Sequence, residues 1–170
     1  MINFTACDYS PNKFYNDLKS QGFKVSKDTI YNYIEHIEDS FLAFTVPLYS
    51  ESLRKTQANQ KKIYTIDSGL VHAYSMSFSN NRGCMFENLI YLDVRRRGDE
   101  IYYYQTKEGY NINFYTRDLK GLFHLYQVVW DTHDQQTMAR EIRALKAAEK
   151  ELGIKGELID PLSYLNFTFM

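Results

Sequence analysis

The chain has 170 residues, which suits one ordinary domain or two small ones that share an interface. Hydrophobic residues make up 44% and charged residues 24%, as in soluble globular proteins, and the formal net charge of −1 excludes a global field that attracts nucleic acid. No run reaches the roughly 18 apolar residues of a membrane span, and the two cysteines show no pairing pattern, so we expect a cytoplasmic protein with no membrane partner.

Aromatic residues are abundant, with 15 Tyr and 11 Phe. Packing of half-buried sheets explains these residues better than base stacking, because aromatic rings fill a core and tyrosine hydroxyl groups can lie at its edge. The four histidines have no zinc-type spacing, so we expect no metal and no cofactor.

The first unit, residues 10–66, predicts helix, turn, helix and a two-stranded ribbon. Pro11 favours a helix over about 11–20, and Ser26 is a good N-cap for a helix that runs to Glu38. A core-facing stripe is expected at helical spacing from Ile30, Tyr33, Ile34 and Ile37. Strands at about 41–49 and 63–66 flank a polar loop at 50–60. This order is typical of a winged helix.

The second unit, residues 67–170, predicts a sheet with flanking helices. After a short helix at about 70–74, a helix at 84–97 stops at Gly98, and strands follow at about 100–105, 111–116 and 122–130. A helix at 137–152 ends before Gly153, and a last strand at 157–159 ends at Pro161. Apolar residues on both faces of 122–130 indicate one mixed sheet with a helix on each side, an α/β (α+β) fold.

Several motifs together resemble a known family, in order and spacing: Lys24–Tyr31, Ser52–Lys55, Lys62–Leu70, Phe86–Tyr91 and Leu125–Val128. Over about residues 10–160 the chain resembles the C-terminal region of archaeal and bacterial AAA-type ATPases. There an ATPase module precedes a winged helix and a domain of unknown function related to the PD-(D/E)xK nucleases. The resemblance implies a winged helix followed by a restriction-endonuclease-like mixed sheet with flanking helices. No GxxxxGK[ST] run occurs, so the phosphate loop of the ATPase is absent.

The nuclease positions implied by the resemblance are degenerate. Glu87 matches the helix carboxylate, but Asn113 and Gln127 stand where the strand carboxylates belong, and Val129 replaces the lysine. One carboxylate of three holds Mg²⁺ poorly, so we expect no catalytic residues and a non-enzymatic protein. Glu87 then pairs within a helix–sheet interface, with Arg95, Arg96 or Arg97 as candidate neighbours. The alternative is a metal-dependent DNA nuclease with a rearranged site, which requires Asp118 or Asp131 to project toward these positions.

Cations without acidic neighbours cluster in the polar loop and the strand after it: Arg54, Lys55, Lys61 and Lys62. They are the candidate DNA contacts, and Arg95–Arg97 could extend them. The helix at 26–39 is acidic, which favours a protein partner, and the cations can also be ordinary solvated charges. We therefore expect a non-catalytic recognition and regulatory module of an AAA-type ATPase that binds DNA or a protein, with the ATPase module as a possible partner.

Overall fold

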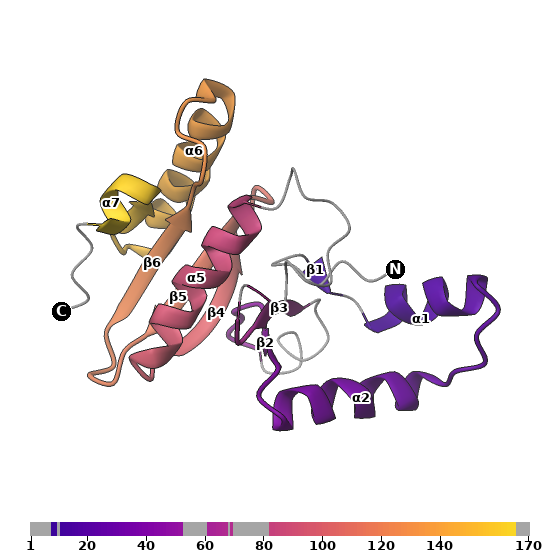
Figure 1. Ribbon diagram of the computed structural model, residues 1–170. Coiled ribbons are helices and arrows are strands. Elements are labelled where there is room, and N and C mark those ends of the chain that lie inside the picture. The colour runs from indigo at the N-terminus through magenta and orange to yellow at the C-terminus, as the bar shows by residue number, and fades with distance from the viewer. Residues whose placement is uncertain (1–7, 10, 53–60, 68, 70–81, 166–170) are drawn as a thin grey trace.

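The computed structural model describes residues 8–9, 11–52, 61–67, 69 and 82–165. Within these ranges the fold is mixed α+β, with a three-stranded sheet of order β1-β3-β2 and a four-stranded sheet of order β4-β5-β6-β7 (Figure 1). The elements are β1 Asp8–Tyr9, α1 Pro11–Ser20, α2 Lys27–Asp39, β2 Ala43–Val46, β3 Lys61–Thr65, α5 Arg82–Arg96, β4 Glu100–Gln105, β5 Asn111–Arg117, β6 Phe123–Val128, α6 Gln135–Leu152, β7 Gly156–Ile159 and α7 Pro161–Leu165. The predicted α+β class is confirmed.

The helices α1 and α2 form a hairpin that projects away from the four-stranded sheet (Figure 1). The α2 helix begins after Ser26, whose Oγ accepts a hydrogen bond from the Thr29 amide at 3.0 Å, as the sequence predicts. Ile30 is buried, but Tyr33 is 62% exposed, so its place in the core-facing stripe was predicted wrongly. Tyr33 lies at the margin of the stripe, where a helix packed on only one side leaves its flanks in solvent.

The small sheet is antiparallel, with Val46 opposite Lys62 and Ala43 opposite Thr65. The strand β2, Ala43–Val46, is shorter than the predicted strand at 41–49, because the chain leaves the sheet after Val46 and runs beside β4. There the Tyr49 amide donates to the Tyr103 carbonyl at 2.8 Å, and the Tyr103 amide donates to the Pro47 carbonyl at 3.0 Å. These two hydrogen bonds connect the first unit to the large sheet.

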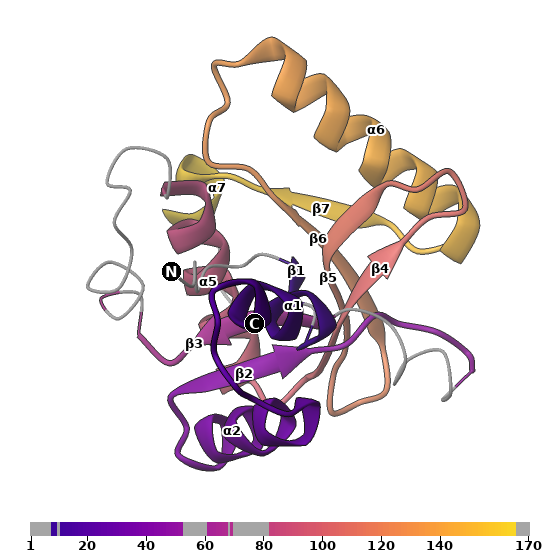
Figure 2. The same cartoon turned by 90° about the vertical axis from the view of Figure 1, so that its right-hand side faces the viewer.

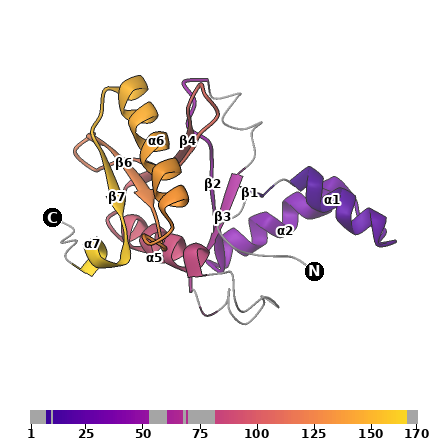
Figure 3. The ribbon, with the colours of Figure 1, turned by 90° about the horizontal axis from the view of Figure 1, so that it is seen from above.

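The large sheet has the predicted mixed topology. Its first three strands are antiparallel, and β7 returns parallel to β6 after the α6 crossover. Phe114 and Tyr126 pack with α5, whereas Ile112 and Leu125 pack with α6. The two helices therefore cover opposite faces of the sheet (Figures 2 and 3), and the prediction of burial on both faces is confirmed.

Pro161 ends β7 as expected, but it also opens the short helix α7, because proline is well suited to the first helical turn. The short helix predicted at 70–74 lies outside the described residues. Among the helices that the structure describes, none has the length and apolar content to cross a bilayer.

Candidate functional site

Glu87 lies on α5 and faces β3. Its Oε1 atom accepts hydrogen bonds from Lys62 Nζ at 3.0 Å and from the Tyr64 hydroxyl at 2.7 Å. The lysine and glutamate side chains are only 8% and 14% exposed. An ion pair so enclosed is a fixed part of the helix–strand interface, because separating its charges would leave each one poorly solvated.

Asn88, the next residue of α5, completes the attachment to β3. Its Oδ1 accepts from the Thr65 amide at 2.8 Å, and its Nδ2 donates to the Thr65 carbonyl at 3.1 Å. Within the described residues, β1 pairs with Lys61 and Lys62 and does not extend to Thr65, where the Asn88 side-chain amide takes the place of a neighbouring strand. We call the set Glu87, Asn88, Lys62, Tyr64 and Thr65 the α5–β3 clamp.

Aromatic rings enclose the clamp. Tyr64 stacks on Tyr91 with ring centroids 4.3 Å apart and an interplanar angle of 13°, and Phe114 lies 5.5 Å from Tyr64. Lys62 Nζ lies 5.8 Å from the centre of the Tyr103 ring. Burial raises the pKa of Tyr91 to about 12, with the nearby Arg95 acting in the opposite direction. Apolar enclosure and a bound cation both reduce the access of Glu87 to an added ligand.

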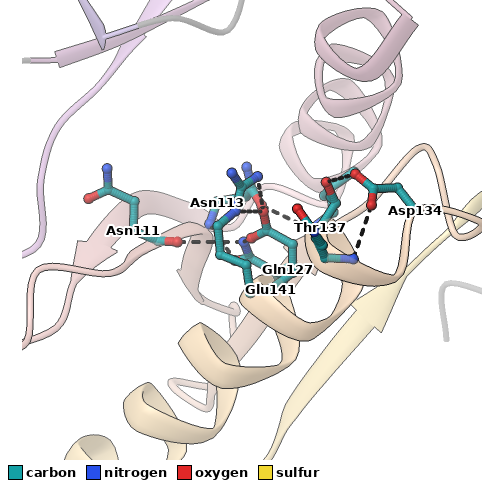
Figure 4. A network of polar contacts seen from close by, with 9 residues as sticks. Asn111, Asn113, Gln127, Asp134, Thr137 and Glu141 are labelled. Carbon is teal, nitrogen blue, oxygen red and sulfur yellow. Dashed lines mark hydrogen bonds and ion pairs between the residues drawn. The ribbon is translucent and has the colours of Figure 1, made fainter.

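Asn113 and Gln127 form a second polar cluster, where the ladder between β5 and β6 ends at Phe114 and Tyr126 (Figure 4). The backbone amide of Asn113 donates to the side-chain Oε1 of Gln127 at 3.1 Å, and the backbone amide of Val128 donates to the side-chain Oδ1 of Asn113 at 2.9 Å. Side-chain amides thus replace the backbone hydrogen bonds that the diverging strands no longer make to each other. We call this pair the amide bridge.

Glu141 of α6 closes the amide bridge, and the sequence analysis missed it. Its Oε2 atom accepts from Gln127 Nε2 at 2.5 Å, and Gln127 Nε2 also lies 3.5 Å from the Asn111 carbonyl oxygen. Arg140 binds the other carboxylate oxygen at 2.6 Å. The available signal was periodicity, because Glu141 stands at helical spacing from the buried Ala144, Leu145 and Ala148.

The predicted nuclease positions do not form one site. Glu87 binds β3 beneath α5, whereas Gln127 faces α6 on the opposite side of the sheet. Val129 is buried, and its amide donates to the Ile159 carbonyl. Across the residues that the structure describes, no group of three or more His, Cys, Asp or Glu side chains is arranged to hold a metal ion.

The aspartates that could rebuild a nuclease site cap turns instead. Asp118 Oδ1 accepts from the Lys120 and Leu122 amides, and Asp118 Oδ2 lies 3.1 Å from His124 Nε2. The hydrogen bond from His124, followed by the bond from the Leu122 amide, lowers the pKa of Asp118. Asp131 accepts from the His133 amide. These contacts hold both carboxylates within their own turns.

The four candidate DNA-contacting residues differ in their exposure and in whether the structure describes them. Arg54 and Lys55 lie outside the described residues, Lys61 is partly exposed on β3, and Lys62 is buried against Glu87. The expected exposure of Lys62 is therefore corrected, since its charge is used inside the clamp.

The arginines expected near Glu87 are also placed elsewhere. Arg95 lies over the Phe44 ring at 3.6 Å, Arg96 binds Asp93 at 2.8 Å, and Arg97 binds Asp99 at 2.9 Å. The prediction that Glu87 pairs within a helix–sheet interface is correct, but its partners come from β3. The arginines contact other groups because Arg95 and Arg96 lie in the last turn of α5 and Arg97 follows the helix, whereas Glu87 lies near its start.

Comparison with known proteins gives relatives of unknown function. Residues 5–81 match a domain of unknown function, DUF8612. The chain is 32% identical over 167 residues to the uncharacterized protein MJ1544 of Methanocaldococcus jannaschii, an alignment that covers 96% of this chain. The chain spans 36% of the length of that relative. No solved structure matches the chain.

Proposed function

We propose that this chain is a non-catalytic recognition module that acts by binding a macromolecular partner. The main observation in support is that the polar side chains at the degenerate nuclease positions already form hydrogen bonds within the protein. Lys62 and Tyr64 donate hydrogen bonds to Glu87. Backbone amides of β5 and β6 donate hydrogen bonds to the side chains of Gln127 and Asn113. Groups used in this way stabilise an interface and leave little capacity for a hydrated metal ion.

The first unit is the recognition element in this proposal. A strand, two helices and two further strands, with the sheet order β1-β3-β2, support the interpretation as a winged helix. Its α2 helix carries Asp28, Glu35 and Asp39 on exposed positions, and no Lys or Arg occurs between Lys27 and Arg54. Phosphate groups would be repelled from such a surface, which favours a protein over DNA as the partner of α2.

The resemblance to the C-terminal region of AAA-type ATPases supplies the class of partner. A module of this kind would couple an ATPase to the molecule on which the ATPase acts, or would regulate the ATPase by binding it. The DNA interpretation depends on Arg54, Lys55 and Lys61, since Lys62 is committed to Glu87. By analogy, the fold permits either partner, and the acidic charge of α2 favours a protein.

The proposal is tested by metal binding and DNA cleavage. Titration of Mg²⁺ or Mn²⁺ into the protein should give no saturable heat at millimolar metal, and supercoiled plasmid should remain uncut. The reason is that Glu87 would have to exchange an enclosed ammonium partner for the ion.

A matched pair of variants makes this test specific. Glu87→Gln removes the one carboxylate that matches the nuclease pattern, and Glu108→Gln removes an exposed carboxylate in the turn between β4 and β5. Cleavage by the unmodified protein that is lost in Glu87→Gln and kept in Glu108→Gln would establish the nuclease alternative and overturn the proposal.

A further inference from the structure

Phe41 has an unusual backbone conformation. With φ of 59°, it is the one non-glycine residue with positive φ within the described ranges. It follows the end of α2, where the Phe41 amide donates to the Glu38 carbonyl at 3.0 Å and the Leu42 amide donates to the Ile37 carbonyl at 3.1 Å. Helices that close in this way usually place glycine at the left-handed position, because a side chain there is strained.

Burial does not explain why phenylalanine occupies this position. Phe41 is 63% exposed, and among the described residues its ring makes an edge-to-face contact with Phe44, with centroids 6.2 Å apart. A bulky residue held in a left-handed conformation with little packing in return is an outlier of the kind that clusters at functional sites.

Exposed apolar residues continue from Phe41 through Leu42 to Ile66. Leu42 is 50% exposed and Ile66 is 43% exposed, and the two are joined because the Ile66 amide donates to the Leu42 carbonyl at 3.1 Å. We call Phe41, Leu42 and Ile66 the Phe41 surface. Contiguous exposed apolar residues beside polar ones mark a binding site more often than isolated ones do.

The charges near this surface indicate the chemistry of the partner. The C-terminal half of α2, which ends two residues before Phe41, carries the exposed acidic residues Glu35 and Asp39, and no lysine or arginine occurs on the helix after Lys27. The exposed Arg95 lies over the neighbouring Phe44 ring at 3.6 Å, so the acidic character of this region is confined to its α2 side, and the Phe41 ring is the one offered to a cation of the partner. A surface that combines apolar contact, carboxylates and aromatic rings is complementary to a basic amphipathic segment.

We propose that the Phe41 surface, with the acidic end of α2, docks an amphipathic helix of a protein partner that presents leucine-type and lysine or arginine side chains. This inference rests on the proposed function as a recognition module and specifies the partner of its first unit. The left-handed position at the helix end fixes the direction of the Cα–Cβ bond of Phe41, which reduces the backbone freedom that would be lost on binding.

The test uses the full chain and a synthetic helical peptide of roughly three heptads with leucine at the apolar positions and lysine at the polar ones. Binding is measured by fluorescence anisotropy of a labelled peptide, and stability by thermal unfolding. Phe41→Gly should weaken binding about tenfold, because it removes the anchor ring. The same substitution should raise the melting temperature by about 2–4 °C, because glycine adopts this conformation without strain.

Two controls accompany this variant. Leu119→Ala removes a more exposed apolar side chain from the hairpin between β5 and β6 and should change the affinity less than about twofold. A peptide with glutamate in place of lysine should bind at least about tenfold more weakly, because the charge complementarity is reversed.

Several outcomes would overturn the inference. They are no binding of the lysine peptide, equal binding by Phe41→Gly, or a lower melting temperature in Phe41→Gly, which would show that packing alone retains the ring. Loss of duplex DNA binding, or loss of a dimer, on Phe41→Gly would assign the surface to DNA or to a second copy of the chain. The non-catalytic role would survive each of these results, since it is tested by metal binding and cleavage.

Discussion

At the scale of single residues, the Lys62 ammonium group depends on one counter-ion. Glu87 neutralises it at 3.0 Å, and the Tyr64 hydroxyl donates a second hydrogen bond to the same carboxylate oxygen. Enclosed charges are costly when one partner is removed, although replacing both partners by uncharged groups is often tolerated. Removing one charge of the clamp should therefore destabilise the fold much more than removing both charges together.

We expect Glu87→Ala to lower the free energy of unfolding by about 3–5 kcal/mol, because it leaves the Lys62 charge enclosed without a partner. The double variant Lys62→Met with Glu87→Gln should recover most of this loss, since glutamine can still accept from the Tyr64 hydroxyl. Urea denaturation of Lys62→Met, Glu87→Gln and the double variant gives the coupling energy. Simple additivity of the two changes would show that the ion pair does not couple the helix to the strand.

At the scale of elements, α6 packs very closely on the start of β7. A Cβ atom at Gly156 would lie 2.4 Å from Leu145 Cδ1 and 3.2 Å from Leu125 Cδ2. A side chain there requires the Leu145 side chain to shift or α6 to move, so the absence of a side chain at Gly156 allows the close packing of the helix on the parallel strand.

Gly156→Ala should therefore lower the free energy of unfolding by about 1–3 kcal/mol through overpacking. The matched control is Gly83→Ala in the first turn of α5, where the new Cβ would lie 3.8 Å from Trp130 Cβ, an ordinary contact. There the better helix propensity of alanine should stabilise the protein by about 0.5–1 kcal/mol. Chemical denaturation gives the free energy of unfolding of both variants, and equal effects of the two changes would refute the packing argument.

Local signals explain which elements could be predicted. The Ser26 cap and the left-handed Gly153 at the end of α6 depend on residues within one helical turn, and both were predicted. The amide bridge joins residues 14 positions apart and the clamp joins residues 25 positions apart. Such pairs form only after strands and helices have docked, so periodicity could place Glu141 on the buried side of α6 but could not identify its partner Gln127 or the partners of Glu87.

At the scale of the whole molecule, tyrosines join the layers of the fold. Tyr91 of α5 stacks on Tyr64 of β3, Tyr104 of β4 donates to Glu151 of α6, and Tyr164 of α7 donates to Asp93 of α5. Tyr115 of β5 lies 4.6 Å from Tyr49 between ring centroids. The high tyrosine content thus serves packing between elements, with hydroxyl groups satisfied by carboxylates at the edges of the core.

These tyrosines predict an alkaline limit to stability. Burial is the main cause that raises the pKa from 10.0 to about 12 for Tyr91, Tyr104, Tyr115 and Tyr164, and the hydrogen bonds from Tyr104 to Glu151 and from Tyr164 to Asp93 act in the same direction. In the unfolded chain the same groups ionise near pH 10. Between pH 10 and 12 the unfolded state therefore binds fewer protons than the folded state, and the free energy of unfolding falls as the pH rises.

Below pH 10 both states keep these hydroxyl groups protonated, so the four tyrosines should leave stability independent of pH there. We expect circular dichroism to show cooperative loss of structure above pH 10, with tyrosinate absorbance rising in the same step, because ionisation of the buried groups requires unfolding. Tyr104→Phe, which removes one such group at the β4–α6 contact, should move the midpoint to higher pH. Full ionisation of all tyrosines near pH 10 with the folded spectrum retained would contradict the packing role assigned to them.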